Sequence, residues 1–294
     1  MSLAFPPACS AASALDEPLP GTAATAPGWV CLEMPSGWGR DVLDGTALGP
    51  GLAGEISAAA DAVGVRFLFV RRPGRDTARR GDGRTVLLAR SDPGGSWCER
   101  LEVGEPKELL DLIPRIVAGP APGLGRAQDR PVALVCAHGK RDRCCAVLGR
   151  PVAAALAAEF GDDVWECSHT GGHRFAPSLI LLPTGYTYGR LDVAQSRDAV
   201  AAAARGEVYL PGLRGRSSWS AAGQVAEIAV RGQVPADADA LVVDEGDAGT
   251  VVRHRDGRRW RVRVETRQLP PRPVSCGADP KPVRPLMATE TTAL

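Results

Sequence analysis

The sequence predicts an α/β protein made of two successive α/β units and a C-terminal antiparallel hairpin extension. Apolar runs of strand length alternate with segments of helical period, which is the first indication. The second is a Gly- and Pro-rich stretch without period at 119–130, which reads as a linker. The third is an alternating pattern after residue 233, interrupted by an Asp-Gly pair typical of a tight hairpin turn. At 294 residues and 44% hydrophobic, the chain can bury one large core or two modest ones.

The first unit is expected over residues 29–118. Residues 1–28 precede it; they are rich in Pro, Ala, Ser and Thr without a period, which predicts a mobile tail. Order is expected to begin with a strand at "WVCLEM", and residues 51–63 are helical in pattern. "VRFLFVRR", "RTVLLAR" and "SWCERLEV" are strand patterns, and Pro106 opens a short helix.

The second unit is expected over residues 131–232. "PVALVC" is a continuous apolar run of strand length that ends at Cys136. Asp142 is a suitable N-cap for a helix that begins at Arg143, and Pro151 must kink that helix or open its second segment. "DVWECSH" and "SLILLP" predict the next strands. Two further helices are expected at 193–205 and 216–231.

The end of the chain is expected to hold little beyond a β-hairpin. Residues 233–269 read as antiparallel strands with Asp256-Gly257 at the turn. The Pro-rich residues 270–294 are expected to be irregular.

Composition narrows the classes of function. The net charge is +1, and no basic run is interleaved with aromatic residues, so nucleic acid is not an expected partner. No apolar run approaches the roughly 18 residues that a membrane span needs, and the first residues lack the basic and apolar regions of a signal peptide. A cytoplasmic location follows as the expectation. Clustered cysteines in a cytosolic protein indicate metal or redox chemistry.

Residues 136–173 concentrate this chemistry, because they hold three of the four histidines and four of the eight cysteines. Cys136 ends a predicted strand, and eight residues separate it from Cys145 in the first turn of the next helix. The helix N-terminus stabilises negative charge, so Cys145 should ionise more readily than a free thiol. A thiolate is the form that a metal requires.

The histidines complete the pattern on the neighbouring predicted strand. His169 follows "DVWECS", and the sequence H-T-G-G-H brings His173 three residues after it. Gly171 and Gly172 permit a tight turn that returns the second imidazole toward the first. Two strand ends can therefore present two thiolates and two imidazoles to one point.

Residue types alone leave the metal open between zinc and a [2Fe–2S] cluster. The two histidines fit a zinc finger, but eight residues between the cysteines are too many for a zinc knuckle. Two Cys and two His also hold the cluster of Rieske centres, where each half of the motif supplies one of each. The neighbours Cys144 and Cys167 are interpreted as packing residues rather than ligands, and His138 flanks the predicted ligands without an assigned role.

Three segments carry a family resemblance: "VCAHGKRDRCCAVLGRPVAAAL", "VWECSHTGGHRFAPSLILLPTGYTYGRL" and "YLPGLRGRSSW". They resemble the sucrase/ferredoxin-like family, over roughly residues 28–232 and most densely over 131–216. That family includes thioredoxin-like ferredoxins with C-x8-C and H-x-G-G-H motifs. The resemblance implies that both α/β units are thioredoxin-like and that the second is a thioredoxin-like ferredoxin.

The resemblance also implies a cofactor and a set of partners. The cofactor is a [2Fe–2S] cluster held by Cys136, Cys145, His169 and His173. The implied role is one-electron transfer, with proton coupling through the imidazoles, or redox sensing with a reductase or acceptor protein. A homodimer is a further implied assembly.

Three other classes of function are weighed against this expectation. A zinc-stabilised binding module would use the same four residues, and a dithiol oxidoreductase would use Cys144 or Cys145 although C-x-x-C is absent. The sucrase activity in the family name lacks sequence support, because the carboxylates are scattered singly rather than paired as a glycosidase requires. They are Asp162, Asp163, Glu166 and Asp192.

Overall fold

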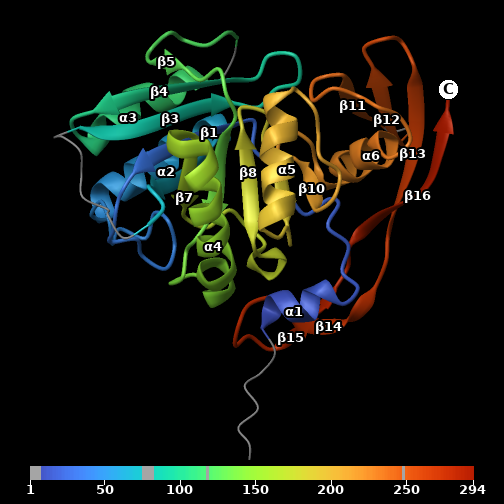
Figure 1. Cartoon of the computed structure of the whole chain (residues 1–294), viewed down its shortest axis with the longest axis horizontal. Helices are drawn as coiled ribbons and strands as arrows, with labels where there is room; N and C mark the ends of the chain where they lie inside the picture. Colours follow the sequence, from blue (N-terminus) through green and yellow to red (C-terminus); the bar gives the residue numbers. More distant parts are fainter. Residues whose placement is uncertain (1–7, 75–82, 117–118, 247–248) are drawn as a thin grey trace, which may run out of the picture.

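A computed structural model describes residues 8–74, 83–116, 119–246 and 249–294. The remaining parts of the predicted tail, first unit and hairpin extension lie outside the described residues. The fold is α/β, as predicted. It contains a ten-stranded mixed sheet, a four-stranded antiparallel sheet and a two-stranded sheet (Figure 1).

The first unit contributes half of the large sheet. Its strands are β1 (Gly28–Glu33), β2 (Arg66–Arg71), β3 (Arg84–Arg90), β4 (Trp97–Val103) and β5 (Arg126–Ala127). Its helices are α2 (Pro50–Val63), η1 (Pro106–Glu108), α3 (Leu109–Leu112) and η2 (Ile113–Ile116). The predicted linker at 119–130 therefore differs from the structure, because β5 pairs with β4 at the sheet edge.

The second unit contributes the other half. Its strands are β6 (Val132–Cys136), β7 (Val164–Cys167), β8 (Ser178–Leu182), β9 (Tyr186–Gly189) and β10 (Leu213–Arg216). Its helices are α4 (Arg143–Phe160), η3 (Gly161–Asp163), η4 (His173–Phe175), α5 (Val193–Ala204) and α6 (Ala221–Arg231). The helix predicted from residue 216 begins later, because Arg216 pairs with β9 and Ser220 caps α6 by accepting from the Gly223 amide.

Both units have the same strand order. Counted outward from their junction, the strands run β7-β6-β8-β9 in one unit and β2-β1-β3-β4 in the other. The first pair is parallel in each unit, and the next two pairs are antiparallel. The units join where Val70 pairs with Cys167 and Arg71 pairs with Glu166, at the carboxyl ends of β2 and β7. Two thioredoxin-like units thus form one continuous sheet.

One apolar cluster crosses this junction and fixes the two units together. Trp29 from β1 and Trp165 from β7 are fully buried in it. Full burial of a large apolar side chain stabilises the folded state by about 1.5–3 kcal/mol. Cys31 and Cys98 also lie in this cluster, which accounts for two thiols that match no motif.

Helix α4 bears on the expectation that no segment has the length and apolar composition of a membrane span. With η3 it forms the segment Arg143–Asp163, whose mean hydropathy of 1.3 over an 18-residue window is enough, by length and composition, to cross a membrane. Valine, leucine and phenylalanine contribute most to this value, and six alanines add to it. The helix packs against β6 and β7 through Val152, Ala153 and Leu156. The helix thus packs one face against the large sheet, and 33% of the 18-residue window is buried.

The C-terminal part contains more strands than predicted. The antiparallel hairpin is confirmed by β11 (Leu241–Gly246), β12 (Gly249–His254) and β13 (Arg259–Thr266). The predicted irregular segment 270–294 instead holds most of β14 (Leu269–Pro273), together with β15 (Pro280–Val283) and β16 (Leu286–Ala293). Prolines are tolerated there because β14 and β15 form a two-stranded sheet, in which both strands are edge strands.

The predicted mobile tail is wrong for residues 8–28. Helix α1 (Cys9–Ala14) lies beside β14 and η4, below the main sheet in Figure 1. The Arg190 guanidinium donates to the carbonyl oxygens of Ser13 at 2.7 Å and Glu17 at 2.8 Å. The segment is held by polar anchors rather than by an apolar period, which is why composition alone indicated a tail.

Candidate metal centre

The first part of the site depends on close contact between α4 and β6. Cys136 is the last residue of β6, and Asp142 caps α4 by accepting a hydrogen bond from the Cys144 amide at 2.9 Å. Gly149 lies so close to the strand that a Cβ there would be 2.1 Å from the Cys136 carbonyl oxygen. Only glycine permits this approach, which brings the first turn of α4 and its Cys145 to the strand end.

The second part depends on the turn after β7. Ser168 anchors the strand end, because its Oγ accepts from the Phe69 amide at 2.9 Å. Gly171 and Gly172 then adopt positive φ values of 93° and 69°. A Cβ on Gly172 would collide with Phe175 at 2.8 Å. The double glycine thus turns the chain so that His173 lies over His169.

These two parts meet at one point. The Sγ atoms of Cys136 and Cys145 and a ring nitrogen of His169 all lie within 4.8 Å of one another. The His173 ring is next to them, with its centroid 5.0 Å from that of His169. The structure therefore brings three of the predicted residues within range of a single metal ion and leaves the fourth beside them.

Electrostatics favour one negative charge on the thiol pair. A hydrogen bond from the Cys145 thiol lowers the pKa of Cys136 well below its usual value, against the effect of burial, and the His169 ring acts in the same direction. The same shared hydrogen bond, with burial, raises the pKa of Cys145. These shifts favour a thiolate at Cys136 that accepts a hydrogen bond from the Cys145 thiol, and a bound cation would displace the remaining proton.

The imidazoles have nitrogen atoms without a hydrogen-bond partner. Among the described residues, Nδ1 of His169 and both ring nitrogens of His173 are buried and make no hydrogen bond of good geometry. Burial and the nearby His169 lower the pKa of His173, against the effects of Asp142 and the Val274 backbone. Ring nitrogens without a hydrogen-bond partner, beside two thiols, fit a cluster of iron and sulfide or a zinc ion by their chemistry.

The neighbours of the four residues have separate roles. His138 Nε2 is 2.8 Å from the Gly39 carbonyl, and its Nδ1 accepts from the His169 amide at 3.2 Å, so it supports the turn. Cys167 lies in the core, and burial raises its pKa well above the usual value. The position of Cys167 agrees with its interpretation as a core residue.

Cys144 belongs to a second group, which sequence reasoning missed. Its Sγ lies with the Sγ atoms of Cys9 and Cys276 and a carboxylate oxygen of Asp142, all within 4.8 Å of one another. Burial acts to raise the pKa of Asp142, but hydrogen bonds from the Cys276 and Cys144 amides lower it to about 2, so this carboxylate is ionised. Cys9 and Cys276 have no motif around them, so no pattern in the sequence indicates the group.

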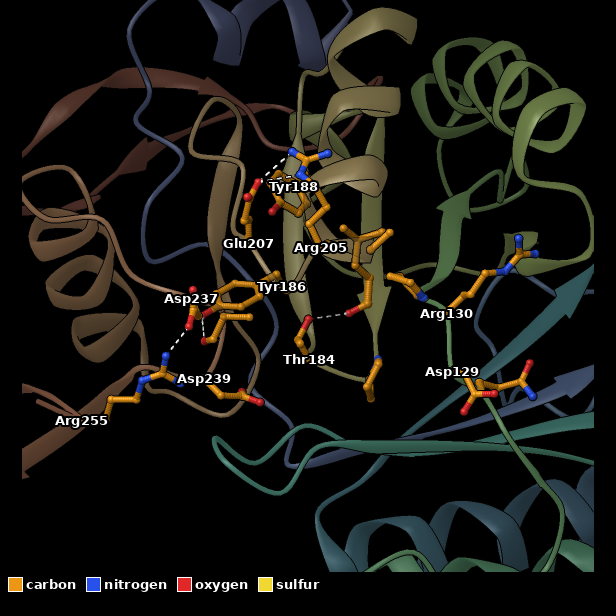
Figure 2. Close-up of a pocket in the computed structure, with 18 residues that line it drawn as sticks. Asp129, Arg130, Thr184, Tyr186, Tyr188, Arg205, Glu207, Asp237, Asp239 and Arg255 are labelled. Atoms are coloured by element: carbon orange, nitrogen blue, oxygen red, sulfur yellow. Dashed lines mark hydrogen bonds and ion pairs between the residues drawn. The ribbon is translucent and has the colours of Figure 1, made fainter.

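A pocket of about 460 Å³ lies apart from both groups (Figure 2). The described residues that line it include neither cysteine nor histidine. Asp237 pairs with Arg255, and Glu207 pairs with Arg205 at 2.7 Å.

The chain thus joins two thioredoxin-like units and carries a cysteine–histidine group between the ends of β6 and β7. It belongs to the class of α/β proteins that have the residues to bind a metal between two strand ends. Within this class, the chain belongs to the sucrase/ferredoxin-like family, whose profile matches residues 19–215. The family predicted from the motifs is thereby confirmed. No curated protein and no solved structure matches the chain.

Proposed function

We propose that the protein carries a [2Fe–2S] cluster on Cys136, Cys145, His169 and His173 and serves in one-electron transfer or redox sensing. One observation carries the proposal: two buried thiols and an imidazole converge within 4.8 Å, and a second imidazole with unused ring nitrogens lies beside them. The family description, which includes ferredoxin-like proteins, supports the same cofactor. The soluble-type fold supports a cytoplasmic location.

The chain provides an asymmetric environment for such a group. When bound, the cluster would supply one-electron chemistry. The two cysteines are about 1% exposed, whereas His169 and His173 are only partly buried. The thiolates are therefore kept from water, and the imidazoles form the side nearest to solvent. A reductase or acceptor protein is expected to dock on the histidine side, where the distance for electron transfer is shortest.

Iron and acid-labile sulfide analysis after anaerobic purification tests this function. The expected result is about two iron and two sulfide per chain and a brown protein. Cys136→Ser is expected to abolish the colour, whereas Cys31→Ser, at a buried core thiol, is the matched control that keeps it. A colourless wild-type chain without iron, prepared anaerobically from iron-replete cells, would exclude the proposal.

A dithiol oxidoreductase is the second candidate, favoured by the shared proton of Cys136 and Cys145. A low-pKa thiol beside a second thiol is the arrangement of such enzymes. The partner of Cys145 is then Cys136 rather than Cys144. Near-complete burial of both thiols disfavours this reading, because a disulfide substrate must reach them. Iron content distinguishes it from the cluster, and zinc that is lost in Cys136→Ser identifies the binding-module alternative.

A further inference from the structure

The second group consists of Cys9, Asp142, Cys144 and Cys276, and we propose that it is a structural zinc site. It is separate from the candidate cluster site, since it shares none of its residues. Cys9 and Cys276 also lie outside residues 19–215, the part of the chain that matches the family. Two of its four residues therefore come from parts of this chain that the family match does not cover.

The spacing of the sulfur atoms fits tetrahedral zinc. Zinc–sulfur bonds of about 2.3 Å place the sulfur atoms of a tetrahedral site about 3.8 Å apart. The Cys9 Sγ lies 3.7 Å from that of Cys144 and 3.6 Å from that of Cys276, and the last two are 3.3 Å apart. Three thiols from three distant parts of the chain therefore already form one face of a tetrahedron of the right size.

Asp142 supplies the fourth donor. Both carboxylate oxygens lie 3.7 Å from the Cys9 Sγ, close to the roughly 3.6 Å expected between sulfur and oxygen ligands of one zinc ion. Oδ1 accepts from the Cys144 amide at 2.9 Å and from the Cys9 thiol at 3.7 Å, and zinc would take the place of that thiol proton. Oδ2 accepts from the Cys276 amide at 2.8 Å and from Ser275 Oγ at 3.0 Å. Such outer hydrogen bonds orient a carboxylate ligand.

Without a metal these thiols stay protonated, because burial and the Asp142 carboxylate raise the pKa of Cys9 and burial raises that of Cys276, so the cation itself must stabilise the thiolates. Cys144 lies in the first turn of α4, where the helix N-terminus stabilises negative charge. Ser10 Oγ lies 3.3 Å from the Cys144 Sγ and can donate to it. Cys9 and Cys144 are buried, so a bound ion would be largely shielded from water. On zinc binding, the thiol protons pass to water and the three thiolates coordinate the ion.

The proposed site would join both ends of the chain to the second unit. Cys9 lies in α1, Cys276 follows β14, and Cys144 with Asp142 belongs to α4. The Asp142 Oδ2 is also 3.8 Å from the His173 Nε2. Zinc would therefore fix the two terminal segments as a cover directly beside the candidate cluster site.

Metal content of the purified full-length chain tests the proposal. We expect about one zinc per chain, reduced tenfold or more by Cys9→Ala, Cys144→Ala or Cys276→Ala. Cys31→Ala is the matched control and should keep the zinc. Cys136→Ala should keep the zinc and lose any iron, so failure of the cluster proposal and failure of this one give different results. Zinc that follows Cys136 rather than Cys9 overturns the proposal.

A second measurement covers variants that fail to fold. The wild-type chain, stripped of metal under reducing conditions, is titrated with Co²⁺ and then with Zn²⁺. Zinc should protect Cys9, Cys144 and Cys276 from alkylation as a set, as read by mass spectrometry, while a chelator should expose them together. Absence of this protection, or a disulfide between any two of the three in freshly purified protein, would refute the zinc site.

Discussion

The two thiol groups share one turn of helix and differ in how the chain assembles them. Cys144 and Cys145 are adjacent in α4, and successive helical residues point about 100° apart. Cys145 thus meets Cys136 and His169, whereas Cys144 meets Cys9 and Cys276. The first group comes from two neighbouring strand ends. The second requires contacts across 135 and 132 positions of the chain.

This difference separates a site made by local topology from a site made by closure of the whole chain. The first group needs only β6, α4, β7 and the double-glycine turn. The second also needs the N-terminal segment and the β14–β15 pair in place. Perturbations of the terminal segments should therefore disturb the second group and spare the first, while perturbations of the β6–α4 contact should do the reverse.

The largest expected effect is that variants of Cys144 and Cys145 lose different metals. Cys145→Ala should remove essentially all iron and leave zinc at the wild-type level, because it deletes a ligand of the first group only. Cys144→Ala should do the opposite. Iron, sulfide and zinc are measured on the same preparations. Loss of both metals in both variants would show that the groups form a single centre.

Release of the N-terminal segment should have the next largest effect. Arg190→Ala removes hydrogen bonds from a charged donor to Ser13 and Glu17, at a cost of about 3 kcal/mol in the free energy of unfolding. Urea unfolding should show this loss, limited proteolysis should cut within α1, and zinc should fall while iron remains. Arg197→Ala, which breaks an exposed ion pair with Glu159, should change stability by less than about 1 kcal/mol.

Overpacking between α4 and β6 should lower iron content more than zinc content. Gly149→Ala places a Cβ against the Cys136 carbonyl and should destabilise the fold by about 1–3 kcal/mol. Iron content should fall more than zinc content, because Asp142 and Cys144 move with the helix whereas Cys136 stays on the strand. Gly54→Ala in α2 meets no atom within 4 Å and should stabilise by up to about 1 kcal/mol. Equal loss of both metals in Gly149→Ala would contradict this account.

The smallest expected effect is at His138. His138→Ala removes the acceptor of the His169 amide, a neutral hydrogen bond worth about 1 kcal/mol. The variant should keep its iron when purified but release it to a chelator several-fold faster, with zinc release unchanged. Rates followed by the loss of visible absorbance would test this. An unchanged rate would mean that the double-glycine turn alone holds the imidazole.

The same contrast explains how far the sequence could be interpreted. Cys136, Asp142 and the H-T-G-G-H turn were predictable because strand ends, helix caps and glycine turns are local. The strand character of Leu286–Ala293 was missed because "LMATETTA" has little apolar alternation; its partner β13 provides the other half of the pairing. Cys9 and Cys276 could not be placed, since a single thiol carries no period and its contact is set by the complete fold.

The N-terminal segment shows a further limit of composition. Residues rich in Ala, Ser and Pro suggest a chain that cannot bury enough apolar surface to order itself. Here Glu17 is only 2% exposed and pairs with Arg174 at 2.8 Å. Ordering is driven by arginines elsewhere in the chain, and a sequence pattern cannot assign those partners.

Because the two units belong to one chain, their association does not depend on protein concentration. The edge of β7 that faces away from β6 is paired with β2 of the same chain, so this edge is unavailable to a second copy. A separate subunit would leave on dilution, whereas a tethered one is present at an effective concentration in the millimolar range. The junction that supports the metal centre should therefore persist at any protein concentration, down to a few molecules in a cell.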